Sequence, residues 1–152
     1  MATPYSKIIE TFVGKVSDYD LPKFTDIEKE TIIIGFMISA CTKFARICKV
    51  DLYDRDETLK QFNQNLDDEI IEIITETMLV EWIKPKVLSS ENLKNCLSTK
   101  DYSLFSPANL LKELRETLDS LKKESKRLIN NYSFAHADFT ELGGWVYEKW
   151  NY

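Results

Sequence analysis

Histidine, glycine and cysteine are scarce in this 152-residue chain, and each shortage excludes a class of site. A single histidine, His136, argues against a His-based metal site or catalytic triad. The four glycines form neither of the common phosphate-binding loops, GxGxxG and GxxxxGKS. The cysteines, Cys41, Cys48 and Cys96, are odd in number and form no CxxC pair. We therefore expect buried or semi-buried thiols of a reducing compartment, without a disulfide framework or zinc site.

Long apolar runs are also missing. The longest, Ile32 to Cys41, has ten residues, which is too short to cross a bilayer but suits a buried helix. The opening residues, MATPYSKIIETF, lack the apolar core of a signal peptide, and we expect none. A net charge of −5 and a pI near 5.0 argue against general attraction to nucleic acid or to an anionic membrane.

What is present is the composition of one globular domain, with 43% apolar and 30% charged residues. Helical periodicity dominates, and no strand pattern is long enough to build a sheet. The predicted fold is therefore all-α. A bundle of about four main helices occupies residues 1–133, and an extended aromatic C-terminal arm occupies residues 134–152.

The first two predicted helices start at recognisable signals. Thr3 is expected to cap the first helix, with Pro4 at its first position. Residues 25–28, Thr-Asp-Ile-Glu, have the form of a capping box and should start a second helix that runs to about Cys48. Because that helix is apolar over most of its circumference, we expect it to be central in the bundle or shared with a partner chain.

The segment 49–66 is polar and acidic. Asp51, Asp54 and Asp56 invite a calcium-loop interpretation, but the glycine and glutamate that an EF-hand needs at loop positions six and twelve are missing. The sequence predicts a turn-rich connection, with a short helix at residues 57–62.

A third helix is expected to begin at a cap on Asn65 or Asp67. Pro85 should end or kink it, because proline lacks an N–H group and clashes with the preceding turn. A shorter helical segment is predicted at residues 90–97.

The fourth helix should begin with Ser106 as cap and Pro107 in the first turn, and run to about Tyr132. Its residues alternate in steps of three and four, which is a heptad seam interrupted at one serine. The seam consists of Leu111, Leu114, Leu118, Leu121, Ser125, Leu128 and Tyr132. Four cations near its end, Lys122, Lys123, Lys126 and Arg127, could touch phosphate, but a solvated helix face is the simpler interpretation.

Catalytic groups do not assemble in any recognisable pattern. Glu69, Glu72, Glu76 and Glu81 can share a helix face, yet without a convergent partner they indicate a wet acidic surface. We expect no enzyme, no catalytic residue, no cofactor and no metal site.

The C-terminal arm is the most informative segment, because tryptophan and tyrosine are the residues that most often anchor interfaces. The candidate partner-binding residues are Phe134, Phe139, Trp145, Tyr147, Trp150 and Tyr152. His136 is expected to be a contact residue, and Gly143-Gly144 lets the chain bend. The arm either covers its own bundle or docks on another subunit. The second is favoured, because the predicted seams already hold enough Leu and Ile to fill them.

Four segments carry a resemblance to a known family. They are PYSKIIETFVGKVSDYDL, LYDRDETLKQFNQNLDDEIIEII, MLVEWIKPKV and DYSLFSPANLLKELRE, and they cover much of residues 4–132. In these segments the chain resembles the head–tail connector proteins of tailed bacteriophages, also called adaptor, neck or head-completion proteins. These are small, mostly helical structural proteins of the virion.

The resemblance implies a homo-oligomeric ring of about twelve copies beneath the portal protein, joining the capsid to the tail. It implies that the arm reaches the portal and that the opposite side receives the next neck or tail-completion protein. DNA would pass through the central channel without specific binding, and no membrane is involved. The location would be the neck of the virion, after synthesis in the host cytoplasm. The acidic balance is compatible with a channel that does not trap the duplex.

Two other classes stay open. A small acidic helical phage protein could inhibit a host nucleic-acid enzyme by DNA mimicry, with carboxylates patterned on one face. The chain could also be a minor subunit of a metabolic or regulatory enzyme.

Overall fold

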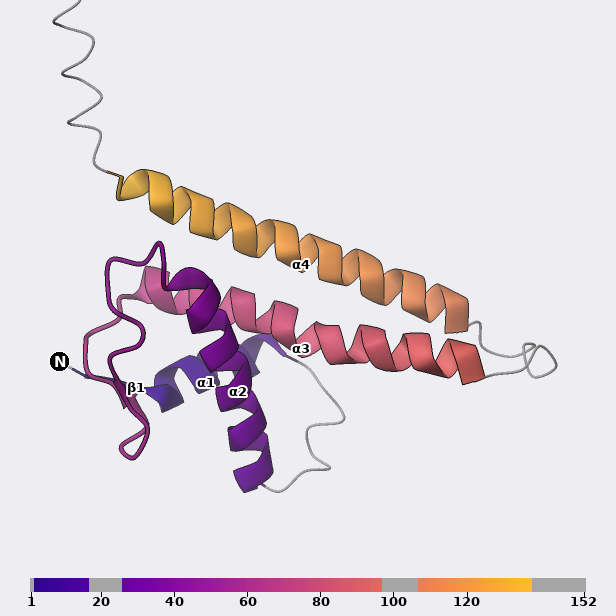
Figure 1. Cartoon of the computed structure of the whole chain (residues 1–152), viewed down its shortest axis with the longest axis horizontal. Helices are drawn as coiled ribbons and strands as arrows, with labels where there is room; N and C mark the ends of the chain where they lie inside the picture. The colour runs from indigo at the N-terminus through magenta and orange to yellow at the C-terminus, as the bar shows by residue number, and fades with distance from the viewer. Residues whose placement is uncertain (1, 17–25, 97–106, 138–152) are drawn as a thin grey trace, which may run out of the picture.

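The fold is a helical bundle with a small three-stranded sheet at one end, as a computed structural model of residues 2–16, 26–96 and 107–137 describes it. In chain order the elements are β1 (Thr3–Pro4), α1 (Tyr5–Lys15), α2 (Asp26–Phe44), β2 (Arg55–Asp56), β3 (Gln61–Phe62), α3 (Asp68–Cys96) and α4 (Pro107–Ala135) (Figure 1). The all-α expectation is confirmed, and the sheet is an addition that the sequence patterns did not indicate.

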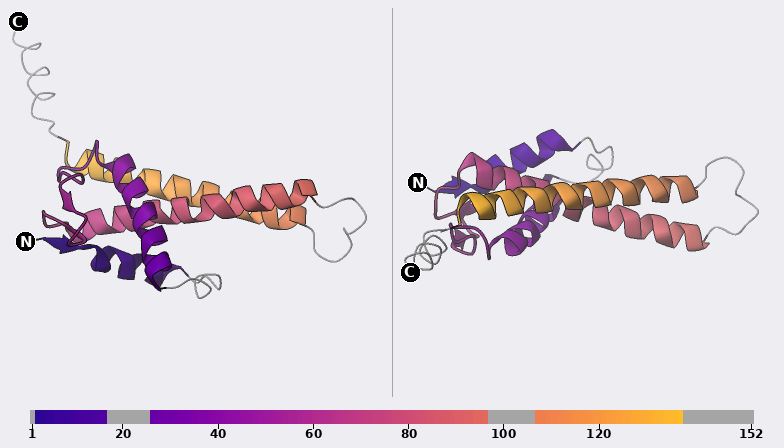
Figure 2. Two further views of the ribbon diagram at one scale, coloured as in Figure 1. Left: turned by 60° about the horizontal axis from the view of Figure 1, so that its bottom comes forward. Right: turned by 90° about the horizontal axis from the view of Figure 1, so that it is seen from above.

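Helix α3 is the centre of the bundle. It packs against α1, α2 and α4, and α4 runs antiparallel beside it (Figure 1). The C-terminal half of α3 and the N-terminal half of α4 extend beyond α1 and α2 as a two-helix projection (Figure 2). The expectation that α2 is central is wrong. Only one side of α2 is buried, and Ile27 near its start is 78% exposed.

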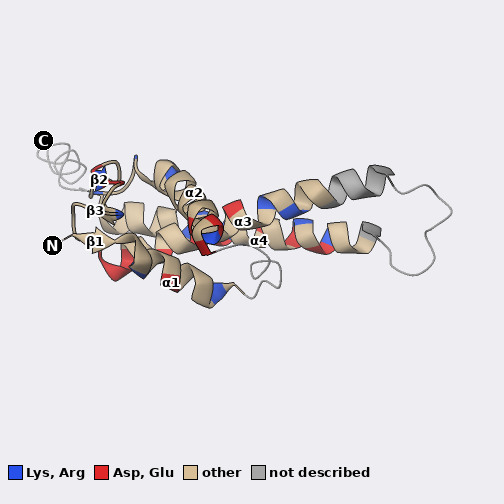
Figure 3. Cartoon of the chain, turned by 90° about the horizontal axis from the view of Figure 1, so that it is seen from below, with Lys and Arg blue, Asp and Glu red and all other residues tan. Residues whose placement is uncertain are grey.

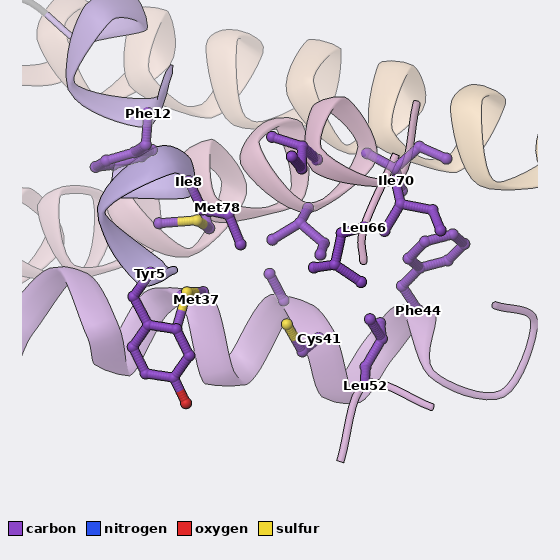
Figure 4. Close-up of a cluster of buried hydrophobic side chains, with 14 of the residues drawn as sticks. Tyr5, Ile8, Phe12, Met37, Cys41, Phe44, Leu52, Leu66, Ile70 and Met78 are labelled. Carbon is purple, nitrogen blue, oxygen red and sulfur yellow. The ribbon is translucent and has the colours of Figure 1, made fainter. Parts of the chain in front are cut away.

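The core has two connected parts. In the larger, side chains of α1 and α2, such as Phe12, Met37 and Phe44, converge on Ile70 and Met78 of α3 (Figure 4). The smaller part fills the seam of the projection. It consists of Val80, Ile83, Val87, Leu111 and Leu118. The half-buried side chains of Trp82 and Leu121 pack against both parts and join them.

The sheet changes the role of the N-terminal residues. Its strand order is β1-β3-β2, and both pairings are antiparallel, with Thr3 and Arg55 opposite Phe62 on either side. Thr3 therefore does not cap α1, and Pro4 occupies the cap position without a side-chain hydrogen bond. The Thr3 hydroxyl is buried and accepts a hydrogen bond of 2.8 Å from the backbone N–H of Leu66. The pairing of β1 with β3 therefore overrides the local signal for Thr3 to cap α1.

The turn-rich connection at residues 49–66 is confirmed, but the short helix expected at 57–62 is not formed. Strands β2 and β3 make a hairpin there, and Lys60 adopts a left-handed conformation with φ of 51°. Phe62 is 1% exposed, and its ring centroid lies 5.2 Å from that of Tyr5. Burial of this ring in β3 favours the strand over the weak local helical signal.

Helix α3 begins at Asp68 and is capped by Asp67, one of the two expected cap residues, whose Oδ1 accepts a 2.8 Å hydrogen bond from the backbone N–H of Ile70. It does not end at Pro85 but continues to Cys96, so the segment predicted as a separate helix at 90–97 is its final part. Pro85 is exposed, and because it has no N–H group it leaves the carbonyl oxygen of Glu81 without its usual helical donor. Ile83 and Val87, on either side of it, keep their packing in the seam.

The other helix ends differ from expectation by three or four residues. Helix α2 ends at Phe44, and a turn leads from there to Cys48, whose N–H donates to the Phe44 carbonyl at 3.1 Å. Helix α4 continues past Tyr132 to Ala135, two residues into the expected arm. Its heptad seam is confirmed, because all seven predicted seam residues are buried or half-buried.

Candidate functional site

The C-terminal end of α4 holds the one candidate partner-binding residue that falls within the described part of the chain. Phe134 lies in the last turn of α4 and is 70% exposed. The other five candidates, Phe139, Trp145, Tyr147, Trp150 and Tyr152, lie outside the described residues. This end of α4 lies beside the C-terminal end of α2, at the end of the bundle opposite the projection (Figures 1 and 2).

Tyr132 fixes this end of α4 on the bundle. It is 2% exposed and makes an edge contact with Phe44, with ring centroids 5.1 Å apart. Its hydroxyl accepts a hydrogen bond from the backbone N–H of Lys49 at 3.3 Å. Burial raises the pKa of this hydroxyl. Because residues two apart on a helix are separated by about 200°, anchoring Tyr132 turns Phe134 toward solvent.

His136 continues the anchored side of α4. Its ring lies 4.1 Å from that of Tyr132, measured between centroids, and Nδ1 is 2.9 Å from the Tyr132 carbonyl oxygen. The ring is half-buried. Both contacts are with Tyr132 of the same chain.

The carboxylates along α3 are paired with lysines of neighbouring elements. Lys15 of α1 donates to Glu72 at 2.6 Å and to Glu76 at 2.7 Å. These two partners raise the pKa of Lys15, although burial acts in the opposite direction. Lys7 pairs with Asp68 in the same way at 2.9 Å. Of the four glutamates predicted to form a wet acidic surface, Glu72 and Glu76 therefore lie where α1 docks on α3, whereas Glu69 is exposed as expected.

Glu81 lies further along α3. Its side chain is 13% exposed, which makes it the most buried of the paired carboxylates of this helix. It pairs with Lys43 of α2 and with Lys84 at 2.8 Å. Burial would raise the pKa of Glu81, but hydrogen bonds from the two lysines outweigh it and lower the pKa. Desolvation, together with the charge of Lys84, lowers the pKa of Lys43 despite its carboxylate partner.

The aspartates of the 49–66 connection stabilise its turns by accepting hydrogen bonds. Asp51 accepts from the backbone N–H of Tyr53 at 2.9 Å, and Asp56 accepts from the backbone N–H groups of Thr58 and Leu59. Asp54 accepts from the side-chain amide of Asn63 at 2.6 Å. Within the described ranges, no group of three or more His, Cys, Asp or Glu side chains could hold a metal ion.

Two of the cysteines have the burial expected of them. Cys41 is fully buried in the larger part of the core, and Cys48 is half-buried; both are free thiols. Burial raises the pKa of Cys41 to about 12, so its sulfur stays protonated and is a poor nucleophile. The side chain of Cys96 lies outside the described part.

One grouping was missed by sequence reasoning. Lys122 and Lys126 of α4, expected on a solvated face, line a pocket together with Lys43 of α2. Lys43 is 79 positions away from Lys122 in the sequence, so no local pattern links them. Elsewhere basic and acidic residues are interspersed along the helices (Figure 3).

None of the helices in the described ranges is both long enough and apolar enough to cross a bilayer. A comparison with known proteins finds no family model, no curated protein and no solved structure that matches this chain.

Proposed function

We propose that the chain is a structural protein of the head–tail connector type of tailed bacteriophages, and not an enzyme. In this proposal copies form a ring beneath the portal protein and join the capsid to the tail. DNA passes through the ring without specific binding. The arm from residue 134 onward is the docking element that reaches the neighbouring protein.

The exposure of Phe134 is the observation that carries this proposal. The bundle buries Tyr132 at 2% exposure, yet leaves the ring two residues later 70% exposed. Burying a phenylalanine side chain stabilises a protein by about 1.5–3 kcal/mol. The parent helices do not supply this stabilisation to Phe134, and a partner surface would. An exposed aromatic at the start of an aromatic-rich segment is typical of an interface anchor.

The charge arrangement favours a scaffold over DNA mimicry. A mimic presents carboxylates to its target, whereas Asp68, Glu72 and Glu76 are engaged by Lys7 and Lys15 within the chain. Glu81 is likewise held by two lysines. Glu76 and Glu81, with side chains 17% and 13% exposed, connect α3 to α1 and α2 through these pairs, which is a structural role for the charge.

The test is a binding measurement with the full-length chain and the portal protein of the same phage. Size-exclusion chromatography with light scattering should show a complex with the portal ring. Phe134→Ser should weaken that complex. Leu59→Ser is the matched control, because Leu59 is similarly exposed, at 65%, but lies in the hairpin between β2 and β3. It should bind like the wild type.

Removing residues 144–152 should abolish portal binding and leave the helical circular dichroism nearly unchanged. A chain that never binds a portal and instead binds a host nuclease would contradict the proposal and support mimicry. Loss of helical signal on the same deletion would show that the segment belongs to the core.

A further inference from the structure

We propose that the pocket between α2, α3 and α4 binds a small organic carboxylate, meaning a carboxylate group carried on a short apolar body. The pocket has a volume of about 190 Å³. Its charged residues are Lys43, Lys122 and Lys126, and Thr77 and Ser125 supply hydroxyl groups. Val80 and Ile129 complete its lining. We name it the lysine pocket.

Positive charge is in excess at the lysine pocket. Lys43 is paired with Glu81, which Lys84 also contacts, and Lys122 lies 3.8 Å from Asp119. Lys126 has no ion-pair partner in the part of the chain that the structure describes. The four lysines and two carboxylates of this neighbourhood leave two positive charges uncompensated. In a chain with a net charge of −5, such a local excess marks a place where an anion is stabilised.

The apolar body of the proposed ligand is inferred from the uncharged residues that line the pocket. Val80 and Ile129 offer apolar surface, and the methylene stems of the lysines extend it. All three contributing segments lie inside helices, where backbone N–H groups are already bonded within the helix. Phosphate sites commonly use free backbone N–H groups at a helix start, which this pocket does not offer. A carboxylate with an apolar body uses both kinds of surface.

The two hydroxyl groups can adapt to an anion. Thr77 Oγ1 lies 2.8 Å from the Ile73 carbonyl oxygen and 2.8 Å from Ser125 Oγ. If Thr77 donates its proton to Ile73, then Ser125 donates to Thr77. With an anion in the pocket, Thr77 can turn its proton to Ser125, which frees the Ser125 proton for the carboxylate. Ile73 keeps its helical bond, so this exchange leaves no buried group unsatisfied.

The size of the pocket limits the ligand. Sites for drug-sized molecules and cofactors have volumes of roughly 300–1,000 Å³, so this pocket suits a group of about the size of benzoate. Such a group can come from a free small acid or from an acidic or C-terminal residue of a partner protein. Both sources present the same chemistry to the three lysines.

The experiment is a titration of the full-length protein with benzoate, followed by backbone amide chemical shifts. Shifts should concentrate on residues of α2, α3 and α4 that line the pocket. Benzamide, which has the same shape without the charge, should bind at least about tenfold more weakly, as loss of a charge-assisted hydrogen bond predicts. Inorganic phosphate should also bind more weakly than benzoate.

Variants locate the site. Lys122→Gln combined with Lys126→Gln should weaken benzoate binding at least about tenfold. Lys123→Gln is the matched control, because Lys123 is an exposed lysine of the same helix that does not line the pocket, and it should bind like the wild type. Equal weakening in the control and the pocket variant would overturn the proposal, as would benzamide or phosphate binding as tightly as benzoate.

A second titration separates the two sources. A short peptide that ends in phenylalanine with a free carboxylate is compared with benzoate and with the amidated peptide. Tighter binding of the free-acid peptide assigns the pocket to a partner protein, and tighter binding of benzoate assigns it to a free acid. Equal binding of the free-acid and amidated peptides, together with no benzoate shifts, would overturn the proposal.

Discussion

The hydroxyl oxygens of Thr77 and Ser125 lie 2.8 Å apart and join α3 to α4 in the middle of an otherwise apolar seam. Both residues are buried, at 2% and 6% exposure. The serine that interrupts the heptad pattern of α4 is thus matched by a threonine on α3. The pair lies where the larger and smaller parts of the core meet.

This pair should be energetically coupled. Thr77→Val and Ser125→Ala should each lower the free energy of unfolding by about 1 kcal/mol or more, because both remove the hydrogen bond between the two hydroxyls and Thr77→Val also removes the bond from Thr77 to the Ile73 carbonyl oxygen. The double variant should lose less than the sum of the two, since both single changes remove the bond between the two hydroxyls and it can be lost only once. Urea denaturation of the four proteins measures the coupling. Thr117→Val, on the exposed side of α4, is the control and should change stability little. Strict additivity would show that the two hydroxyls act independently.

Two adjacent leucines of α4 should respond very differently to truncation. Leu111 is 4% exposed and packs in the seam of the projection, whereas Leu110 is 52% exposed. Leu111→Ala should cost about 2–4 kcal/mol through lost burial and a residual cavity. Leu110→Ala should cost less than about 0.5 kcal/mol. Denaturant midpoints give the comparison. Similar losses at the two positions would mean that the register of α4 on α3 is different.

The ion pairs of Glu81 should make part of the stability depend on pH. Its pKa in the folded protein lies below the ordinary value of 4.5, so its contribution is present above that value and is lost as the pH falls through the lowered pKa. Glu81→Gln should lower the free energy of unfolding at pH 7 by about 1 kcal/mol. The difference from the wild type should disappear in acid. Glu116→Gln, at a pair whose side chains are 74% and 67% exposed, should change stability little at either pH. A constant difference across the pH range would refute the role given to Glu81.

Pro85 should be a position where the protein can be stabilised. The helix runs through it, so the proline carries the cost of a missing hydrogen bond and a steric conflict without ending α3. Pro85→Ala should raise the free energy of unfolding by about 1–3 kcal/mol, as seen in thermal or urea denaturation. Pro107→Ala, at the first position of α4 where proline is favoured, should give no gain. An unchanged or lower stability of Pro85→Ala would mean that the proline relieves a strain elsewhere.

The sequence by itself determined those features that depend on neighbours along the chain. The step of three and four from Leu111 to Tyr132 correctly predicted which side of α4 is buried, because helical periodicity places those side chains on one face wherever the helix lies. The cap expected at Asn65 or Asp67 correctly placed the start of α3, where Asp67 is the cap, since a cap acts on N–H groups two or three residues away.

The tertiary structure decided which of these local signals prevailed and which distant residues meet. Thr3 bonds to Leu66 instead of capping α1, because β1 pairs with β3. Helices α2 and α3 are both rich in apolar residues, and only packing made α3 the central one, since burial depends on what arrives from other parts of the chain. The same holds for Lys43 and Lys126, which line one pocket although no local pattern connects them.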